Sequence, residues 1–356
     1  MNNKVISATT MDGEEMLKII EAKSTKGNFQ LIYTRRPNAY ESYLRESDRV
    51  NIGLIKDKNG KIAMQTTCIG KDYYINGKKT TIGYVGGVRK REDYEGFFNW
   101  KDLSDFVKAS NYDMYYCSFL TSNDSSIEIF TKKRKNFPQL FPVDEYTTYI
   151  INPKVFNKEK KPMNSKYNFR CIEEVDLERV YAFLNKEGSK YNFAPVVEDL
   201  EKQFTDLLLK DCFILEDEGE ILAFGALWNQ TGYKQYIVTK YTGFLKILSK
   251  FSRITEKLGY IAIPKENEIM DFPILSLFFS KDHNPDYYNC FLSKISEVIK
   301  ENYKMFVIGI NNKDPNNQVY KKLRSIKFKS NIYFVRYDKD ITLDEGKNIH
   351  IECGFL

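Results

Sequence analysis

The sequence predicts an α/β fold in which two domains of the same architecture follow each other. The chain has 356 residues, more than one compact core usually accommodates. Its composition is 42% hydrophobic and 29% charged, so burial of apolar surface can offset the entropy of ordering the chain. The order strand, helix, hairpin, strand–loop–helix, strand, helix, strand occurs twice, which indicates a duplicated architecture.

The first domain is expected over residues 1–152. Asn59-Gly60 and Asn76-Gly77 each lie between alternating apolar and polar residues, a pattern that favours a tight hairpin turn. Residues 80–88 then form the expected central strand. After a charged turn, Trp100, Leu103, Phe106 and Val107 recur at helical spacing. The other expected elements are strands at 29–33, 113–120 and 145–151 and helices near 39–45 and 125–134.

Residues 153–167 are polar, basic and contain prolines, which predicts a linker. The second domain is expected over 168–340, with a tail at 341–356 that packs on the fold. Its central strand is predicted at 272–279, and helices follow at 288–299 and 316–326. An insertion at 229–269 precedes the central strand, and residues 241–258 are expected to be mostly helical.

Charge and cysteine usage exclude several classes of function. The net charge is +6, but both signs are interspersed, and a nucleic-acid-binding protein would show a denser basic stripe. The mild basic excess suits an anionic ligand such as a nucleotide cofactor. Six dispersed cysteines and two histidines provide no metal-binding spacing. Without a long apolar run, we expect a cytoplasmic protein that does not enter membranes and binds no metal.

The central strand of the first half, Gly83-Tyr84-Val85-Gly86-Gly87-Val88-Arg89, runs into Asp93-Tyr94-Glu95-Gly96. This order of elements resembles the GNAT superfamily of acyl-CoA N-acyltransferases. The whole chain is similar to a bacterial group of tandem GNAT proteins with degenerate CoA-binding motifs, which also has stretches like residues 192–195 and 228–235. The resemblance implies two GNAT-like domains, each with a mixed, mostly antiparallel sheet flanked by helices.

The resemblance also implies acetyl-CoA as co-substrate and a place for it. In that family an Arg/Gln-x-x-Gly-x-Gly/Ala turn after the central strand holds the pyrophosphate. The corresponding residues here are Val85, Gly86, Gly87, Val88 and Arg89 on the strand and Glu95, Gly96, Phe97, Phe98 and Asn99 in the turn.

The turn departs from the family pattern at three positions, and the third is Trp100, which stands at the Gly/Ala position. Glu95 stands where Arg or Gln is expected, and a carboxylate about 4 Å from a phosphate repels it by ~4 kcal/mol at an effective dielectric of about 20. Phe98 stands at a required glycine, and a bulky residue in a left-handed conformation costs about 1–2 kcal/mol. The alternative is a turn packed by Phe97, Phe98 and Trp100 that binds no phosphate.

Candidate catalytic residues follow from the same resemblance. Tyr320 falls on the tyrosine that protonates the departing CoA thiolate, whereas Phe130 takes that place in the first half. An amine with a pKa of about 10 must lose a proton before it attacks, and Asp271 and Glu92 lie at the ends of the central strands as candidate bases. The alternative is that Tyr320 belongs to the core and both carboxylates to the surface.

The stretch after residue 227 combines aromatic and polar side chains that could line a substrate pocket or form a polar loop: Trp228, Asn229, Gln230, Lys234 and Gln235. The sequence therefore predicts an acetyl-CoA-dependent N-acetyltransferase in which a small primary amine attacks the thioester directly. The alternative is a non-catalytic pseudo-acetyltransferase that serves as a scaffold or as a small-molecule or acyl-CoA binding module. The oligomeric state is left open.

Overall fold

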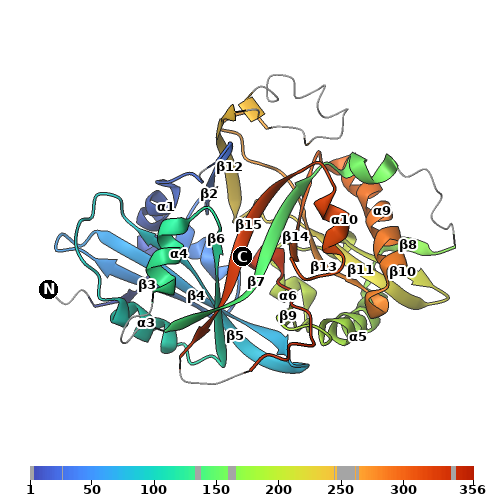
Figure 1. Cartoon of the computed structure of the whole chain (residues 1–356), viewed down its shortest axis with the longest axis horizontal. Helices are drawn as coiled ribbons and strands as arrows, with labels where there is room; N and C mark the ends of the chain where they lie inside the picture. The colour runs from blue at the N-terminus through green and yellow to red at the C-terminus, as the bar shows by residue number, and fades with distance from the viewer. Residues whose placement is uncertain are drawn as a thin grey trace.

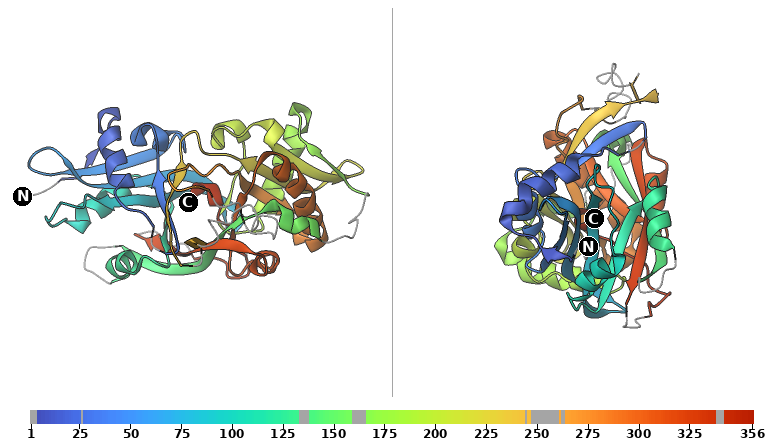
Figure 2. Two further views of the ribbon diagram at one scale, coloured as in Figure 1. Left: turned by 90° about the horizontal axis from the view of Figure 1, so that it is seen from above. Right: turned by 90° about the vertical axis from the view of Figure 1, so that its left-hand side faces the viewer.

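A computed structural model describes residues 4–25, 27–132, 138–158, 166–243, 245–246, 261, 264–337 and 342–356. Most of the expected helix at 241–258 lies outside these residues, and Tyr241, which is described, ends strand β12 (Gln235–Tyr241) instead. Within them, thirteen strands form one sheet in the order β1–β3–β4–β5–β6–β15–β7–β14–β13–β11–β10–β8, with β9 paired to β4, and β12 and β2 form a separate ribbon. Figures 1 and 2 show helices on both faces of this sheet.

The first half supplies β1 to β7 and four helices. The strands are β1 (Ile6–Ser7), β2 (Phe29–Thr34), β3 (Val50–Lys56), β4 (Ile62–Ile75), β5 (Lys78–Lys90), β6 (Met114–Leu120) and β7 (Gln139–Ile151). The helices are α1 (Gly13–Glu21), α2 (Ala39–Leu44), α3 (Trp100–Lys108) and α4 (Asp124–Thr131).

The second half repeats this order after a short 3-10 helix at Pro153–Lys158. Its strands are β8 (Asn168–Cys171), β9 (Ala194–Pro195), β10 (Cys212–Asp217), β11 (Glu220–Trp228), β12 (Gln235–Tyr241), β13 (Ile274–Ser280), β14 (Phe306–Asn311) and β15 (Ser325–Arg336). Its helices are α5 (Leu177–Gly188), α6 (Leu200–Gln203), α9 (Pro285–Asn302) and α10 (Asn317–Lys321).

Local sequence signals account for the hairpins and for the start of α9. Asn76 and Gly77 both have positive φ (52° and 79°) between β4 and β5, as a two-residue hairpin turn with matching twist requires. The predicted β3–β4 hairpin is also confirmed. Pro285 is the first residue of α9, and the Asn284 side chain accepts from the Asp286 N–H, as proline and asparagine favour at these positions.

The two halves exchange their last strands. β15, from the end of the second half, lies between β6 and β7 of the first half and pairs with both. β7 in turn pairs with β14 of the second half, and Figure 1 shows β7 and β15 crossing the middle of the molecule. The largest core cluster accordingly joins residues from both halves, including Tyr116, Phe193 and Trp228. The domain limits at 152 and 168 stay a prediction.

Each half also contains one parallel strand pair that separates along its length. β5 and β6 pair only over Ile82–Met114 to Tyr84–Tyr116, and β13 pairs with β14 only at Ile274 and Val307. Just beyond the separation, β5 has Gly87 at φ +61° and β13 has Leu277 at φ +51°. In both places the register with the neighbouring strand shifts, as at a β-bulge.

The strand exchange predicts that neither half folds alone. Residues 1–158 expressed without the rest would leave β7 without β14 and β15, and its edge unpaired. We expect an unfolded or aggregated fragment by far-ultraviolet circular dichroism and size-exclusion chromatography. Co-expression with residues 159–356 should restore a one-to-one complex, with the intact chain as the reference. A cooperative unfolding transition of the isolated fragment would contradict this assignment.

Candidate functional site

The separation of β5 from β6 opens into a cavity of about 420 Å³, the central cavity. All five predicted strand residues lie in its wall: Val85, Gly86, Gly87, Val88 and Arg89. Helices α3 and α4, together with Asn123 just before α4, close its sides with Trp100, Leu103, Ser104, Val107, Ser126 and Phe130. A cavity of this size falls within the range of small-molecule sites in proteins, about 300–1,000 Å³.

The central cavity continues to the middle of the molecule, between the two halves. Its wall there is largely apolar and comes from β2, β7, β13, β14, β15 and the segment before β13: Leu31, Tyr33, Ile150, Met270, Phe272, Ile274, Val307 and Phe328. Cys353, Phe355 and Leu356 border it as well, consistent with the central place of the C-terminus in Figure 1. Both halves and the tail therefore shape this one space.

Gly87 is the point in the wall where only glycine fits. Its φ is +61°, and an added Cβ would lie 2.8 Å from the Tyr43 hydroxyl oxygen and 3.0 Å from Oγ1 of Thr67. A side chain there would be strained and would collide with its neighbours. The bulge therefore leaves main chain exposed to a ligand in the cavity.

The predicted turn residues lie outside the wall. Phe97 is 97% exposed, and Glu95 is exposed too. The Phe98 ring packs 5.2 Å from the Tyr94 ring, Gly96 lies close to the same tyrosine, and Asn99 caps α3 by accepting from the Lys101 N–H. Phe98 and Trp100 thus pack as expected for a turn filled by aromatic side chains, whereas Phe97 points to solvent.

The two candidate bases are surface carboxylates. Glu92 lies 3.5 Å from the Lys23 ammonium, with both side chains more than half exposed. Asp271 is exposed and accepts a hydrogen bond of 2.9 Å from Nδ2 of Asn229. Neither lines the central cavity.

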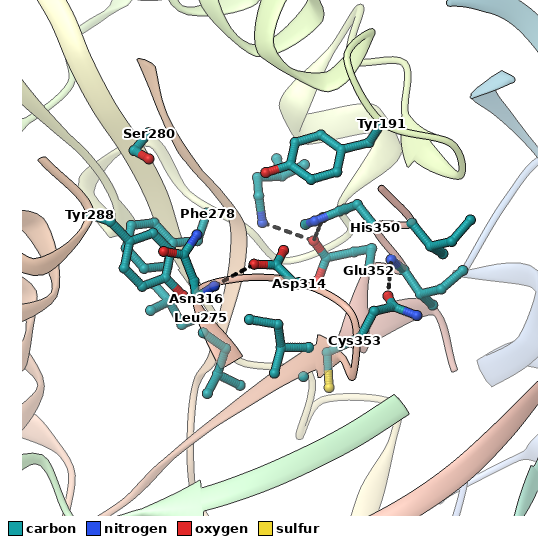
Figure 3. Close-up of a pocket in the computed structure, with 17 residues that line it drawn as sticks. Tyr191, Leu275, Phe278, Ser280, Tyr288, Asp314, Asn316, His350, Glu352 and Cys353 are labelled. Carbon is teal, nitrogen blue, oxygen red and sulfur yellow. Dashed lines mark hydrogen bonds and ion pairs between the residues drawn. The ribbon is translucent and has the colours of Figure 1, made fainter. Parts of the chain in front are cut away.

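In the second half, the equivalent space between β13 and β14 is filled by the chain itself. Oε2 of Glu352 accepts from the N–H of Leu277 at 2.8 Å, and the N–H of Ile351 donates to Oδ1 of Asn311. Figure 3 shows Glu352 and His350 reaching into this space beside Asp314. Only about 30 Å³ remains, which is the room of about one water molecule.

Burial controls the titration of the groups in this filled space. Burial raises the pKa of Glu352 and lowers the pKa of His350 to about 4. Nε2 of His350 lies 4.0 Å from Oε2 of Glu352. Because the imidazole is neutral at neutral pH, this contact is not an ion pair there.

Tyr320 lies in the core of the second half and lines neither cavity. It is fully buried, and its hydroxyl forms a hydrogen bond with the hydroxyl of Tyr288. Burial raises its pKa well above the ordinary value. A catalytic role for Tyr320 stays a prediction. In the structure, Tyr320 and Tyr288 form a buried, hydrogen-bonded pair.

Most of the predicted substrate residues hold the tail. Nε2 of Gln230 and Nζ of Lys234 both donate to the main-chain oxygen of Gly354, at 2.9 and 3.0 Å. The Trp228 ring packs 5.7 Å from the Phe355 ring. Asn229 bonds to Asp271, and Gln235 bonds to the main chain of Arg36. Of these five residues, only Lys234 lines the central cavity.

Reasoning from the sequence missed a charged cluster of Arg35, Glu46 and Lys234 in the wall, with Lys71 beside it. Arg35 and Glu46 are buried and form an ion pair, and Nζ of Lys234 lies 3.7 Å from Glu46. Nζ of Lys71 donates to the main-chain oxygen of Glu46. In the sequence, Arg35 and Glu46 stand on either side of Pro37 and the short helix α2. Charged residues in such a segment are normally solvated, so their burial could not be expected.

Neither a family model nor a curated protein matches this sequence. Solved structures match over nearly the whole chain. Yeast (Saccharomyces cerevisiae) N-myristoyltransferase with bound myristoyl-CoA has a TM-score of 0.56 and 10% identity, covering 98% of this chain and 84% of that chain. A conserved protein of unknown function from Enterococcus faecalis V583, described as a probable N-acyltransferase, has a TM-score of 0.51 and 8% identity. The match covers 94% of this chain and 72% of that chain.

A GCN5-related N-acetyltransferase from Anabaena variabilis has a TM-score of 0.52 and 7% identity, covering 94% of this chain and 72% of that chain. The chain has the GNAT acyl-CoA N-acyltransferase fold. The expected mixed, mostly antiparallel sheet flanked by helices is confirmed. At these identities the likeness concerns the GNAT fold alone.

The described residues contain no group of three or more His, Cys, Asp or Glu side chains placed to hold a metal ion. Within the same ranges, no helix is long and apolar enough to cross a membrane.

The variant Glu352→Gln tests whether the buried Glu352 side chain, which fills the space between β13 and β14, makes stability depend on pH. A raised pKa in the folded state means that the stability contributed by protonated Glu352 is present below its ordinary pKa of 4.5 and is lost as the pH rises through the folded value. Wild type should therefore lose stability relative to Glu352→Gln as the pH rises above about 5, measured by urea unfolding. Glu345→Gln, an exposed change in the same tail, serves as control. A pH-independent difference would contradict the assignment.

Tyr320→Phe separates a structural from a catalytic role. Removing the hydroxyl leaves the buried Tyr288 hydroxyl without this partner, which should cost about 1–3 kcal/mol of unfolding free energy. Because Tyr320 lines neither cavity, we expect any acyl transfer to keep its kcat. Tyr287→Phe, one residue from Tyr288, is the control for stability. A large loss of kcat at unchanged stability would instead support the proton-donor role.

Proposed function

We propose that this protein is an acyl-CoA-dependent N-acyltransferase whose first half binds the acyl-CoA. The observation that carries the proposal is the central cavity at the point where β5 separates from β6, with the Gly87 bulge in its wall. An extended ligand arm can enter between the separated strands, because the strand edge there has main-chain groups that no neighbouring strand takes up.

The proposed reaction needs little chemistry from side chains. The amine nitrogen attacks the thioester carbonyl carbon, the carbonyl oxygen gains negative charge, and the carbon–sulfur bond then breaks to release the CoA thiolate. Main-chain N–H groups at the bulge support the proposal because fixed donors can stabilise that developing charge. The attacking nitrogen must be neutral, and its proton passes to water or to a base.

The wall itself offers one side-chain carboxylate, Glu46. Burial raises its pKa, but Arg35 and Lys234 outweigh that effect and hold the pKa below its ordinary value. A carboxylate so stabilised is a weak base. The exposed Glu92 and Asp271 would act only through water, so we assign the wall a binding and orienting role.

Acetyl-CoA with a small primary amine is the narrower form of the proposal. A longer acyl group is a second candidate, because the central cavity continues into the apolar region around Phe272, Val307 and Phe328. The non-catalytic alternative, an acyl-CoA-binding module, is favoured by the surface positions of both candidate bases. Comparing release of CoA thiol from acetyl-, octanoyl- and myristoyl-CoA with an amine panel distinguishes these possibilities.

A matched pair of variants tests the binding site. Ser126 on α4 lines the central cavity, whereas its neighbour Ser125 is exposed and does not. Ser126→Trp should fill the cavity and weaken acyl-CoA binding by at least about tenfold, equal to about 1.4 kcal/mol. Ser125→Trp should change the affinity for acyl-CoA by less than about twofold. Calorimetric titration of acetyl- and octanoyl-CoA measures both.

Two results would count against the proposal. If neither wild type nor Ser125→Trp binds any acyl-CoA at millimolar concentration, the acyl-CoA site is wrong. If wild type and Ser126→Trp bind equally well, the ligand lies elsewhere. Saturable binding without CoA release for any amine would favour the non-catalytic alternative.

A further inference from the structure

A pair of hydroxyl groups bridges β5 and β6 at the point where the two strands separate. The last residues that pair in the ladder are Tyr84 on β5 and Tyr116 on β6. Beyond them, the Tyr84 hydroxyl lies 2.8 Å from Oγ of Ser118 and forms a hydrogen bond with it. Tyr84 and Ser118 both line the central cavity, and both are partly exposed. The hydrogen-bonded pair therefore borders the space that the strand separation opens.

The Tyr84 ring is held between two neighbours. It packs on the ring of the fully buried Tyr116, with 4.9 Å between the ring centroids. On β5 itself, a Cβ added to Gly86 would lie 2.9 Å from Cε1 and 3.4 Å from Cζ of Tyr84. The side chain thus leans along the strand, as side chains in strands commonly do. The carbon that carries the hydroxyl therefore lies beside Gly86, which is next to the bulge at Gly87.

The pair has a donor that the described part of the chain does not use. Two hydroxyl groups carry two protons, and their mutual hydrogen bond uses one of them. Among the described residues, the Tyr84 and Ser118 hydroxyls form no other hydrogen bond. Burial raises the pKa of Tyr84 to about 12, although the bond with Ser118 opposes the rise. The phenol is therefore protonated at neutral pH, and one O–H remains for an acceptor in the cavity.

This donor lies in the gap between the strands, because the Tyr84 hydroxyl reaches across to Ser118 on β6. The main-chain groups of β5 beyond Tyr84 have no ladder partner on β6, so they are open to a ligand in the same gap. The proposed function places the thioester carbonyl oxygen against main-chain N–H groups at the Gly87 bulge. A hydroxyl beside Gly86 and an N–H at the bulge can converge on that one oxygen.

We propose that the Tyr84 hydroxyl is a second donor to the carbonyl oxygen of the bound acyl-CoA, and that Ser118 aligns it by donating to the tyrosine oxygen. This inference rests on the proposed function for the ligand and its place in the gap. As the amine nitrogen bonds to the carbonyl carbon, the electron pair of the C=O π bond moves to the oxygen, and Tyr84 keeps its proton. When the carbonyl forms again, that pair returns and the carbon–sulfur bond breaks.

The hydrogen bond should act mainly on the rate. A charged oxygen is a stronger acceptor than a neutral carbonyl oxygen, so the bond strengthens toward the transition state. Tyr84→Phe should therefore lower kcat at least about tenfold and change the Kd of acyl-CoA less than about twofold. Tyr73→Phe is the matched control and should keep kcat. Its hydroxyl pairs with that of Tyr116 at 3.2 Å, and neither residue lines the central cavity.

Infrared spectroscopy of acetyl-CoA labelled with carbon-13 at the carbonyl measures the hydrogen bond directly and needs no acceptor. Hydrogen-bond donors lower the C=O stretching frequency. Bound to wild type or to Tyr73→Phe, the label should absorb below the frequency of free acetyl-CoA, and bound to Tyr84→Phe it should shift less. An equal shift in wild type and Tyr84→Phe, or an unchanged kcat of Tyr84→Phe, would overturn the proposal.

Two further variants locate the donor. Ser118→Ala should cause a smaller loss of kcat than Tyr84→Phe, because it removes only the group that aligns the tyrosine. Tyr43→Phe removes another hydroxyl beside the bulge, 2.8 Å from the position of a Cβ on Gly87. A larger loss in either variant than in Tyr84→Phe would overturn the assignment to Tyr84. If Tyr84→Phe fails to fold, as judged by circular dichroism, Ser118→Ala replaces it, and an unchanged kcat and carbonyl frequency would overturn the proposal.

Failure of this inference is distinguishable from failure of the proposed function, because calorimetry and the infrared measurement use acetyl-CoA alone. If acetyl-CoA does not bind to the intact chain at millimolar concentration, the proposed acetyl-CoA site fails, and the role of Tyr84 fails with it. If acetyl-CoA binds saturably and the carbonyl frequency does not depend on the Tyr84 hydroxyl, only the role of Tyr84 is overturned.

Discussion

The position of β15 between β6 and β7 is the constraint on which the rest of the structure depends. A strand from the end of the chain completes the sheet of the first half, and β7 of the first half completes that of the second. The two halves therefore cannot move apart without breaking ladder hydrogen bonds along whole strands. This fixed arrangement is what allows residues of both halves to enclose one central cavity.

The two halves each contain a pair of parallel strands that separate, but only the first-half separation leaves a large cavity. Between β5 and β6 the space is open to a ligand, whereas between β13 and β14 it is filled by residues 349–353. The filling is specific, because the Glu352 carboxylate meets the N–H of Leu277 at the bulge. In our proposal, the first half therefore binds the ligand, whereas the filled space in the second half supports the fold. Gln230 and Lys234 extend that support by holding Gly354.

The turn after β5 explains how a departure from the family pattern can be compatible with ligand binding. Glu95 and Phe97 are exposed, and neither lines the central cavity. In the proposed site, a ligand would meet these residues only at its outer end, where water screens charge. The inner wall depends instead on Gly87 and on the buried charged residues Arg35, Glu46 and Lys234.

The sequence by itself determined the local elements: the Asn-Gly hairpins, Pro285 at the start of α9, and the duplicated order that led to the GNAT fold. These features are set by neighbouring residues, through turn geometry and side-chain periodicity. The tertiary structure alone decided which half is open, because that depends on where the tail packs. It also decided that Lys234 borders the cavity while Tyr320 does not, and that Arg35 and Glu46 are buried, since burial of charge requires partners distant in sequence.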